Sequence, residues 1–271
     1  MALPVAIQVY SVRDEAKADL RGTLEQIKEM GYAGVEFAGL YGYAPAEVKK
    51  ICEEVGLIPI SAHVPYLDMA GAPRAILSQY AEIGCKYVAV PYLTDKYRPG
   101  TPAFPEVIEN VERIGKAAKE LGIQLLYHNH DFEFVKLENG EYGLDYMYSN
   151  TPAENLQTEL DTCWVNIGGE VPAEYIRKYA GRCPVVHLKD FVGSKSENMY
   201  ALIGTDAAKM EDSNKFEFRP VGSGKQDFPA ILEAAVESGA EYVIVEQDNT
   251  YDSPCLEAAK MSRDYLKSLG W

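Results

Sequence analysis

The sequence predicts a single (β/α)8 TIM barrel, a closed parallel sheet of eight strands covered by helices, on three observations. The chain has 271 residues, close to the ~250 that such a barrel needs. Short apolar runs alternate with amphipathic helical patterns eight times along the chain. The runs are nearly continuous in apolar residues, which is typical of parallel strands buried on both faces. We therefore expect one domain over residues 1–271.

Eight segments rich in β-branched residues are the expected strands. In chain order they cover residues 5–10, 34–39, 59–64, 86–92, 124–130, 156–162, 184–191 and 241–248. Helix signals fill the segments between them. In residues 18–31 apolar side chains recur at helical spacing, and Gly31 stands where a helix C-cap is expected. Residues 105–122 repeat this plan, with Pro105 near the start and Gly122 just past the end.

A doubly wound open sheet is the alternative architecture. It usually carries a glycine-rich phosphate-binding turn after its first strand, whereas this chain continues with VYSVRDE. The longest connection covers residues 192–227, after the seventh expected strand. Long loops inside compact domains commonly serve as lids or binding loops, so we expect such a role for this segment.

Composition excludes several classes of partner. The formal net charge is -15, and an acidic surface repels the phosphates of nucleic acid. Five widely spaced cysteines with no C-x-x-C pair indicate reduced thiols in a cytoplasmic protein. No basic leader and no apolar stretch of ~18 residues is present, so we expect neither a signal peptide nor a membrane span. The apolar C-terminal Trp271 leaves a homo-oligomer possible.

Polar residues gather at the carboxyl ends of the expected strands, where barrel enzymes place their chemistry. All four histidines lie there, and none lies in an expected helix. Residues two positions apart share one face of a strand, so several acids should point the same way as the histidines. The full set is His63, His128, His130 and His187 with Gln8, Glu36, Glu159, Asp161, Lys189, Glu246 and Asp248.

So many ionisable groups around one axis are costly to bury unless a cation compensates for their charge. A divalent metal is the simplest such cation. Imidazole and carboxylate ligands suit Mn²⁺, Co²⁺, Fe²⁺ or Mg²⁺ better than a structural zinc site, although Zn²⁺ is possible. His187 and Glu246 are favoured as ligands. Asp161 is also a candidate helix N-cap, and His63 is either a substrate contact or a hydrogen-bonded loop histidine.

Five segments resemble the sugar phosphate isomerase/epimerase family, which has a xylose-isomerase-like TIM barrel: GYAGVEFAG, YHNHDFEF, ELDTCWVNIGG, VVHLKD and VEQD. The most similar branch contains inosose dehydratase-like proteins and keto-glycoside lyases, and the resemblance covers essentially the whole chain. It implies one divalent metal, whose ligand positions fall on His128, Asp161, His187 and Glu246. Epimerases of the family commonly carry glutamate where this chain has His128. Either His128 ligates, or the site has three protein ligands and water, and a plain ketose 3-epimerase is disfavoured.

The resemblance also implies a reaction. We expect a divalent-metal-dependent lyase or isomerase that acts on a keto-sugar or cyclitol by removing a proton next to a carbonyl. His130 corresponds to the base of the dehydratases, and Lys189 would stabilise the enediolate. Glu159 is an alternative acid or base. Isomerisation, epimerisation and elimination share this first half.

Further residues are expected to bind the substrate. Trp164 stands where the epimerases tend to carry histidine and would offer an apolar platform to a sugar ring. Arg219 would reach a substrate oxygen or phosphate, unless it belongs to a surface turn. The expected substrate-binding set is Gln8, Glu36, His63, Glu133, Trp164 and Arg219.

Two other functional classes stay open. The first is a metal hydrolase of the endonuclease IV type, which shares this barrel but binds three zinc ions through many more histidine and glutamate ligands. It also needs a cationic face for DNA, and four histidines with a net charge of -15 count against it. The second is a non-catalytic sugar-binding barrel, in which a full ligand set with a base would be superfluous.

Overall fold

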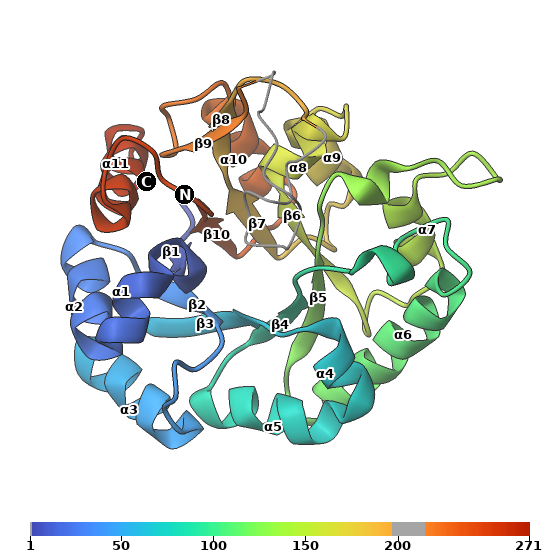
Figure 1. The fold of residues 1–271 in the computed structure, drawn as a ribbon, viewed down its shortest axis with the longest axis horizontal. Coiled ribbons are helices and arrows are strands. Elements are labelled where there is room, and N and C mark those ends of the chain that lie inside the picture. Colours follow the sequence, from blue (N-terminus) through green and yellow to red (C-terminus); the bar gives the residue numbers. More distant parts are fainter. Residues whose placement is uncertain (1, 197–214) are drawn as a thin grey trace.

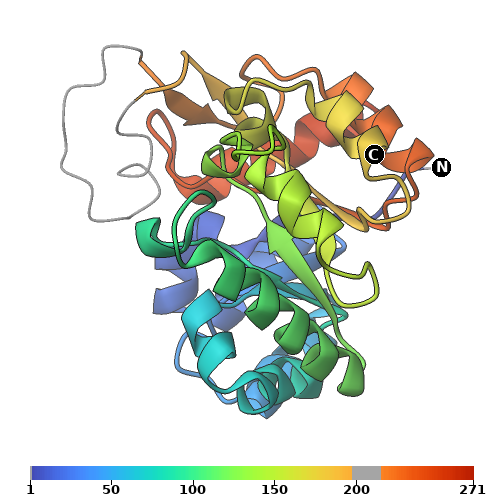
Figure 2. The same ribbon diagram turned by 90° about the vertical axis from the view of Figure 1, so that its right-hand side faces the viewer.

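The computed structural model describes residues 2–196 and 215–271. Eight parallel strands close into a barrel in the order β1-β10-β7-β6-β5-β4-β3-β2, so the expected (β/α)8 TIM barrel is confirmed. The strands are β1 (Val5–Gln8), β2 (Gly34–Ala38), β3 (Ile58–His63), β4 (Tyr87–Val90), β5 (Gln124–His128), β6 (Gln157–Asp161), β7 (Val185–Leu188) and β10 (Tyr242–Val245). The two termini lie side by side (Figures 1 and 2).

Helices surround the ring of strands (Figure 1). They are α1 (Arg13–Ala18), α2 (Leu20–Met30), α3 (Pro45–Val55), α4 (Tyr66–Gly71), α5 (Pro73–Ile83), α6 (Phe104–Glu120), α7 (Gly143–Ser149), α8 (Thr162–Ile167), α9 (Pro172–Lys178), α10 (Phe228–Glu237) and α11 (Cys255–Ser268). The expected stop at Gly31 is observed, with a φ of 91° that suits glycine. Within the described ranges, every helix is too short or too polar to cross a membrane.

The strands end earlier than the sequence predicts. β1 stops at Gln8, whose side chain accepts a hydrogen bond from the Tyr10 N–H at 2.9 Å and so turns the chain into a short 3₁₀ helix. β5 stops at His128 and β7 at Leu188. Because the chain must leave the sheet to reach the next helix, His130 and Lys189 sit just beyond the strands, at the barrel mouth.

The barrel interior has an apolar floor and a polar layer above it. The floor is a separate cluster of buried side chains formed by Ala6, Ile60, Tyr87, Ala89, Leu126, Val185 and Ile244. Two residues beyond four of these floor residues, on the same faces, stand Gln8, His128, His187 and Glu246, each at most 4% exposed. Glu36 and Glu159, in β2 and β6, are also fully buried. The change from apolar to polar that the sequence predicts is therefore present on β1, β5, β7 and β10.

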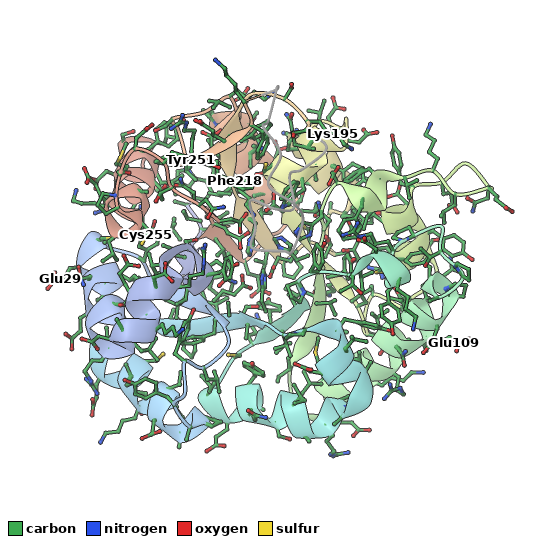
Figure 3. The ribbon with its side chains drawn as sticks, in the orientation of Figure 1. Glu29, Glu109, Lys195, Phe218, Tyr251 and Cys255 are labelled. Atoms are coloured by element: carbon green, nitrogen blue, oxygen red, sulfur yellow. The ribbon has the colours of Figure 1, made fainter. Side chains whose placement is uncertain are left out.

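The connection after β7 contains a second, small sheet. β8 (Asp190–Val192) pairs antiparallel with β9 (Glu217–Arg219). Phe191 and Phe218 of this hairpin pack with Trp164 of α8 in one buried cluster, and Figure 3 labels Phe218 on this side of the barrel. Residues 197–214 of the expected loop lie outside the described residues, so its role as a lid stays a prediction.

All five cysteines are free thiols, as the sequence predicts. Cys52, Cys85, Cys163 and Cys183 are buried, and Cys255 is half-buried. Burial raises the pKa of Cys52 to about 11, and burial likewise raises the pKa of the other four above its ordinary value. These thiols therefore stay protonated at neutral pH, and we assign them structural roles.

Candidate metal and active site

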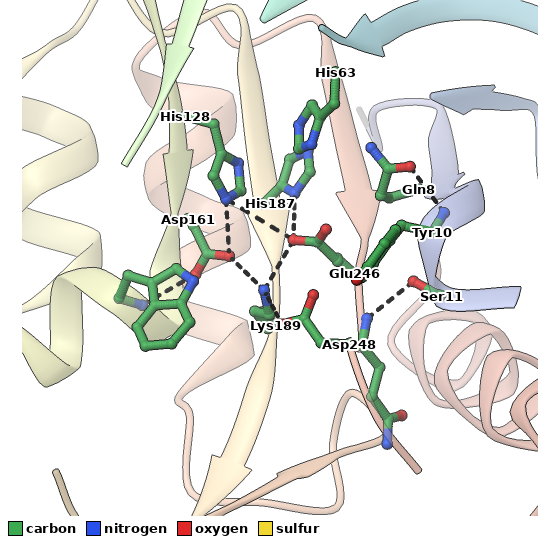
Figure 4. Close-up of polar contacts among 12 residues, drawn as sticks. Gln8, Tyr10, Ser11, His63, His128, Asp161, His187, Lys189, Glu246 and Asp248 are labelled. Carbon is green, nitrogen blue, oxygen red and sulfur yellow. Dashed lines mark hydrogen bonds and ion pairs between the residues drawn. The ribbon is translucent and has the colours of Figure 1, made fainter. Parts of the chain in front are cut away.

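Four side chains from four neighbouring strands converge at the barrel mouth. His128 of β5, Asp161 of β6, His187 of β7 and Glu246 just after β10 each offer an atom, and these atoms all lie within 4.8 Å of one another. Figure 4 shows them pointing toward a common centre. His128 Nε2 lies 3.7 Å from Asp161 Oδ2 and 3.9 Å from Glu246 Oε2, and His187 Nδ1 lies 3.2 Å from the same Glu246 oxygen. We call this set the upper cluster.

A second polar group lies beneath the upper cluster and shares its two imidazoles. Glu159 Oε1 lies 2.7 Å from His63 Nε2 and 3.1 Å from His128 Nδ1. Glu36 Oε2 lies 2.8 Å from His187 Nε2, and it accepts a hydrogen bond from Gln8 at 2.7 Å. We call Gln8, Glu36, His63 and Glu159 the lower network.

The two groups differ in part of their spacing. The His187–Glu246 pair of the upper cluster is also a hydrogen bond at 3.2 Å, but its other two pairs lie farther apart than those of the lower network. Ligands bound at 2.0–2.2 Å to one metal lie about 3 to 4 Å apart, which fits the upper cluster. Distances of 2.7–3.1 Å in the lower network are those of hydrogen bonds. One atom each of His63, His128, Glu159 and His187 also lie within 4.8 Å of one another, but the hydrogen bonds of Glu159 to His63 and His128 account for their proximity. The upper cluster is therefore our candidate metal site, and its occupation by a metal stays a prediction.

The chemistry of the donors supports a divalent metal in the upper cluster. Oδ2 of Asp161 is buried and accepts no hydrogen bond from the described residues, although the Lys189 ammonium lies 3.5 Å away. The other oxygen, Oδ1, accepts the Trp164 N–H at 3.0 Å and caps α8. The N-cap interpretation of Asp161 is therefore confirmed, and the oxygen that does not cap the helix faces the cluster. The ligand role itself stays a prediction.

The lower network determines which imidazole nitrogens face the upper cluster. If His128 donates its Nδ1–H to Glu159, its Nε2 lone pair points at Asp161 and Glu246. His187 likewise directs Nε2 at Glu36 and Nδ1 at Glu246. Carboxylates that accept the second N–H of a ligating histidine hold the ring and raise its basicity. The lower network thus holds His128 by a hydrogen bond and places a carboxylate 2.8 Å from Nε2 of His187.

The charges of the lower network follow from burial and close contact. Burial alone would lower the pKa of His63, but the carboxylates of Glu36 and Glu159 outweigh it and raise the pKa to about 10. Burial, followed by the charge of Glu36, raises the pKa of Glu159 to about 7. His63 is therefore an imidazolium held between two carboxyl groups, a hydrogen-bonded role that the sequence left open.

His130 and Lys189 flank the upper cluster. The His130 ring stacks on Trp164 at 5.0 Å and on Phe132 at 5.4 Å between ring centroids. Burial, and next the charge of Lys189, keep the pKa of His130 well below its ordinary value. The Lys189 ammonium lies 2.6 Å from Asp248 and 3.0 Å from Glu246. Burial would lower the pKa of Lys189, but these carboxylates and Asp161 raise it.

A cavity of about 850 Å³ opens above these groups. Of the residues that the sequence assigns to catalysis or substrate binding, His63, His130 and Lys189 line it. Glu159 is fully buried in the lower network, a placement that favours orientation of the histidines over proton transfer to a substrate. Its expected catalytic role stays a prediction.

The other expected substrate contacts do not line this cavity. Gln8 and Glu36 are fully buried in the lower network, and Glu133 is fully buried beneath His130. Trp164 is also fully buried, behind His130 and not beside the cavity. Arg219 pairs with Glu217 and Asp252 on the β9 side. Substrate contact by these five stays a prediction, and their placement in the described residues favours supporting roles.

Several residues of the site were not among the expected catalytic or binding residues. Asp248 binds the Lys189 ammonium, and its signal was present, because it follows Glu246 by two positions on the same face. Leu40, Tyr43 and Ile76 line the far side of the cavity. They come from a loop and from α5, and no pattern in the sequence indicates which helix face approaches the barrel mouth.

A family model described as xylose isomerase-like TIM barrel matches residues 24–269. The chain belongs to this family. It is 26% identical over 208 residues to an inosose dehydratase of Clostridium perfringens, which covers 76% of this chain and 68% of the relative. An inosose dehydratase of Geobacillus kaustophilus is 23% identical over 280 residues, 91% of this chain and 86% of that protein.

Solved structures share the fold. A sugar phosphate isomerase/epimerase from Parabacteroides distasonis superposes with a TM-score of 0.80 and 22% identity, covering 99% of this chain and 94% of that one. A 3-keto-D-glucoside 4-epimerase from E. coli gives a TM-score of 0.70 and 18% identity, with 98% and 99% covered. The resemblance read from the sequence motifs is thus confirmed.

Proposed function

We propose that this protein is a divalent-metal-dependent lyase or isomerase that acts on a keto-sugar or cyclitol by removing a proton next to a carbonyl. One observation carries the proposal. Two members of the upper cluster, His128 and Glu246, line the floor of one cavity together with the His130 imidazole and the Lys189 ammonium, at the carboxyl ends of the barrel strands. The names of the family relatives, inosose dehydratases, support a small cyclitol or sugar substrate.

His128, Asp161, His187 and Glu246 would hold the metal. A divalent cation there would polarise the carbonyl and hydroxyl oxygens of a bound sugar and make the adjacent C–H more acidic. Mn²⁺, Co²⁺ or Fe²⁺ suits two imidazoles and two carboxylates, and Mg²⁺ or Zn²⁺ is chemically permitted. A metal held by these four residues would also orient those oxygens, and neighbouring side chains would move the proton and stabilise the developing charge.

His130 is the proposed base. A base must be neutral before it accepts a proton, and the lowered pKa of His130 satisfies this at neutral pH. Its ring lies between Phe132 and Trp164, and Glu133 accepts its backbone N–H at 2.8 Å. The imidazole is therefore held in one orientation before the substrate arrives, which lowers the cost of reaching a reactive geometry.

Lys189 is the proposed electrostatic partner. Its ammonium lies inside the same cavity and stays charged, because three carboxylates surround it. A positive charge placed there stabilises the negative oxygen that develops when the proton leaves carbon. After this step, return of a proton to carbon gives isomerisation or epimerisation, and loss of a β-substituent gives elimination.

Solvent exchange tests the proposal. The Mn²⁺-loaded protein is incubated with inosose or a 3-keto-glucoside in deuterated water, and exchange at the carbon next to the carbonyl is followed by NMR. We expect His130→Ala to lower the exchange rate by about 100-fold or more while keeping its bound metal. His187→Ala should lose both the exchange activity and the bound metal.

The two possible failures are distinct. Exchange at the wild-type rate in His130→Ala would remove His130 as the base. If the wild-type protein, loaded in turn with Mn²⁺, Co²⁺, Fe²⁺ and Mg²⁺, neither exchanges nor converts any keto-sugar or inosose, the proposed function is wrong.

A further inference from the structure

The cavity extends well beyond the groups that would hold and deprotonate a sugar. Its polar floor is formed by His128, His130, Lys189 and Glu246 at the ends of β5, β7 and β10. From there it crosses the barrel mouth toward the loops after β2, β3 and β4. That far side is built from Leu40, Tyr43, Val64, Ile76, Tyr80 and Pro91.

The far side is mostly apolar, apart from the exposed Asp68 and Gln79. Leu40 and Tyr43 come from the loop between β2 and α3, and Ile76 and Tyr80 project from α5. Tyr43 is 36% exposed, and Leu40 and Ile76 are half-buried. Apolar side chains that line a concave site next to a polar floor are the usual arrangement for binding the apolar part of a ligand.

The volume of the cavity exceeds the needs of one sugar ring. At ~30 Å³ per water molecule in the liquid, 850 Å³ would hold about 28 waters. That number is more than twice the count of non-hydrogen atoms in a hexose. A hexose or cyclitol seated on the polar floor would therefore leave the apolar side filled with water, which an apolar group on the substrate would displace favourably.

The charges in the cavity oppose a phosphorylated substrate. Among the described lining residues the cationic groups are Lys189 and the His63 imidazolium, and carboxylates already pair with both. Asp248 and Glu246 bind the Lys189 ammonium, and Glu36 and Glu159 lie 3.1 and 2.7 Å from His63 Nε2. The apolar side carries one charged residue, the exposed Asp68, which is an acid. A phosphate group on that side would meet negative charge and lack a partner for its oxygens.

We infer that the cavity selects an uncharged keto-sugar or cyclitol that carries an apolar, ring-bearing substituent, with this substituent against Leu40, Tyr43 and Ile76. The inference rests on the proposed function, whose sugar site it extends. Apolar area removed from water by the substituent contributes to binding, and the cavity accommodates it without displacing any described side chain.

Three matched probes test the inference on the wild-type protein loaded with Mn²⁺. They are methyl 3-keto-β-D-glucoside, phenyl 3-keto-β-D-glucoside and the 6-phosphate of the methyl compound. We expect kcat/KM for the phenyl compound to exceed that for the methyl compound by about tenfold or more, and the phosphate to be the poorest substrate. Equal values for phenyl and methyl, or a preferred phosphate, would overturn the inference.

Variants test which side of the cavity produces the preference for the phenyl compound. Tyr43→Ala and Ile76→Ser should each reduce the phenyl-to-methyl ratio by at least about threefold. Leu67→Ala is the matched control, because Leu67 is 53% exposed on α4 and does not line the cavity. A phenyl-to-methyl ratio that falls equally in Leu67→Ala, or in neither cavity variant, contradicts the assigned side of the cavity.

Binding without reaction separates this inference from the proposed function. Phenyl and methyl β-D-glucoside lack the ketone, and their affinities are compared by calorimetry. If no keto-sugar is converted but the phenyl glucoside binds about tenfold more tightly, the proposed function fails and the apolar site stands. If keto-sugars are converted without any phenyl preference in rate or binding, the inference alone fails.

Discussion

At the residue scale, Glu133 is a carboxyl group that the fold keeps protonated. It is fully buried, and burial raises its pKa to about 8. Its two oxygens lie 2.6 Å from the Tyr127 hydroxyl and 2.8 Å from the His130 backbone nitrogen. Glu133 therefore fixes the start of the turn that carries His130, and we regard it as a positioning residue for the proposed base.

Stability should depend on pH through Glu133. The folded protein keeps this proton up to about pH 8, whereas the unfolded chain releases it near the ordinary value of 4.5. Between these values the folded state binds more protons, so the free energy of unfolding falls as pH rises. Glu133→Gln mimics the protonated form and lacks this loss.

Urea unfolding at pH 5 and pH 8 measures the effect. The free energy of unfolding of the wild type, relative to Glu133→Gln, should fall by at least about 1 kcal/mol between the two pH values. If the difference in free energy of unfolding between the wild type and Glu133→Gln is the same at pH 5 and at pH 8, Glu133 is already ionised in the folded protein.

The lower network makes a second prediction at this scale. Glu159→Gln keeps the shape of the side chain but removes the charge that faces His63 and His128. We expect metal affinity to fall by about 10 to 100-fold, the usual effect of losing a group that orients a ligand. Titration with Mn²⁺ against a chelator measures it.

A matched variant is the control for Glu159→Gln. Glu109→Gln makes the same chemical change on the exposed face of α6, far from the cluster (Figure 3), and should bind metal as the wild type does. Unchanged affinity in Glu159→Gln would assign the network a purely structural role.

At the scale of elements, Asp190 joins the β8–β9 hairpin to the start of α10. Its carboxylate accepts backbone N–H groups from Phe191, Gly222, Gly224 and Gln226, at 2.7–3.2 Å. The turn at residues 221–224, VGSG, thus surrounds the Asp190 carboxylate of the protein itself. A side chain at Gly224 would place its Cβ 2.3 Å from an Asp190 oxygen, so glycine is required there.

Asp190→Asn should destabilise the protein by about 1–3 kcal/mol, because an amide nitrogen would face backbone N–H groups that need an acceptor. Thermal denaturation measures the loss. Asp252→Asn is the comparison, since Asp252 pairs with Arg219 at an exposed surface and should change stability by less than about 0.5 kcal/mol. Similar losses in the two variants would contradict the special role of Asp190.

At the scale of the whole molecule, the upper cluster ties together four adjacent strands of the barrel. β5, β6 and β7 each supply one candidate ligand and the residue after β10 supplies the fourth, so a bound ion would oppose the separation of these strands. A ligand present at 100 times its dissociation constant stabilises the folded state by about 2.7 kcal/mol. For a chain of this length, that corresponds to a rise in Tm of about 5 to 10 °C.

We therefore expect removal of the metal with EDTA to lower Tm by this amount, and restoration with Mn²⁺ to reverse the change. The double variant Asp161→Asn with Glu246→Gln should show the same low Tm with or without metal. If chelation leaves the Tm of the wild type unchanged, the upper cluster does not bind a structurally coupled ion.

The sequence by itself determined the barrel and most of the polar constellation at its mouth. Apolar strand runs and helix stops such as Gly31 depend on neighbours in the chain, and alternation along a strand assigns His187 and Glu246 to inward faces. Because all parallel strands end at one rim, residues far apart in sequence, such as His128 and Glu246, could be expected to meet.

Tertiary structure decided how these residues divide into layers and which of them reach the cavity. Glu36 and Glu159 share a rim with the candidate ligands in the sequence, yet only the fold shows which partners they meet. Glu159 hydrogen-bonds His63 and His128, and Glu36 lies 2.8 Å from His187 Nε2. The apolar side at Tyr43 and Ile76 depends on how α5 and a loop pack against the barrel. Such packing results from contacts between distant segments, which local patterns do not encode.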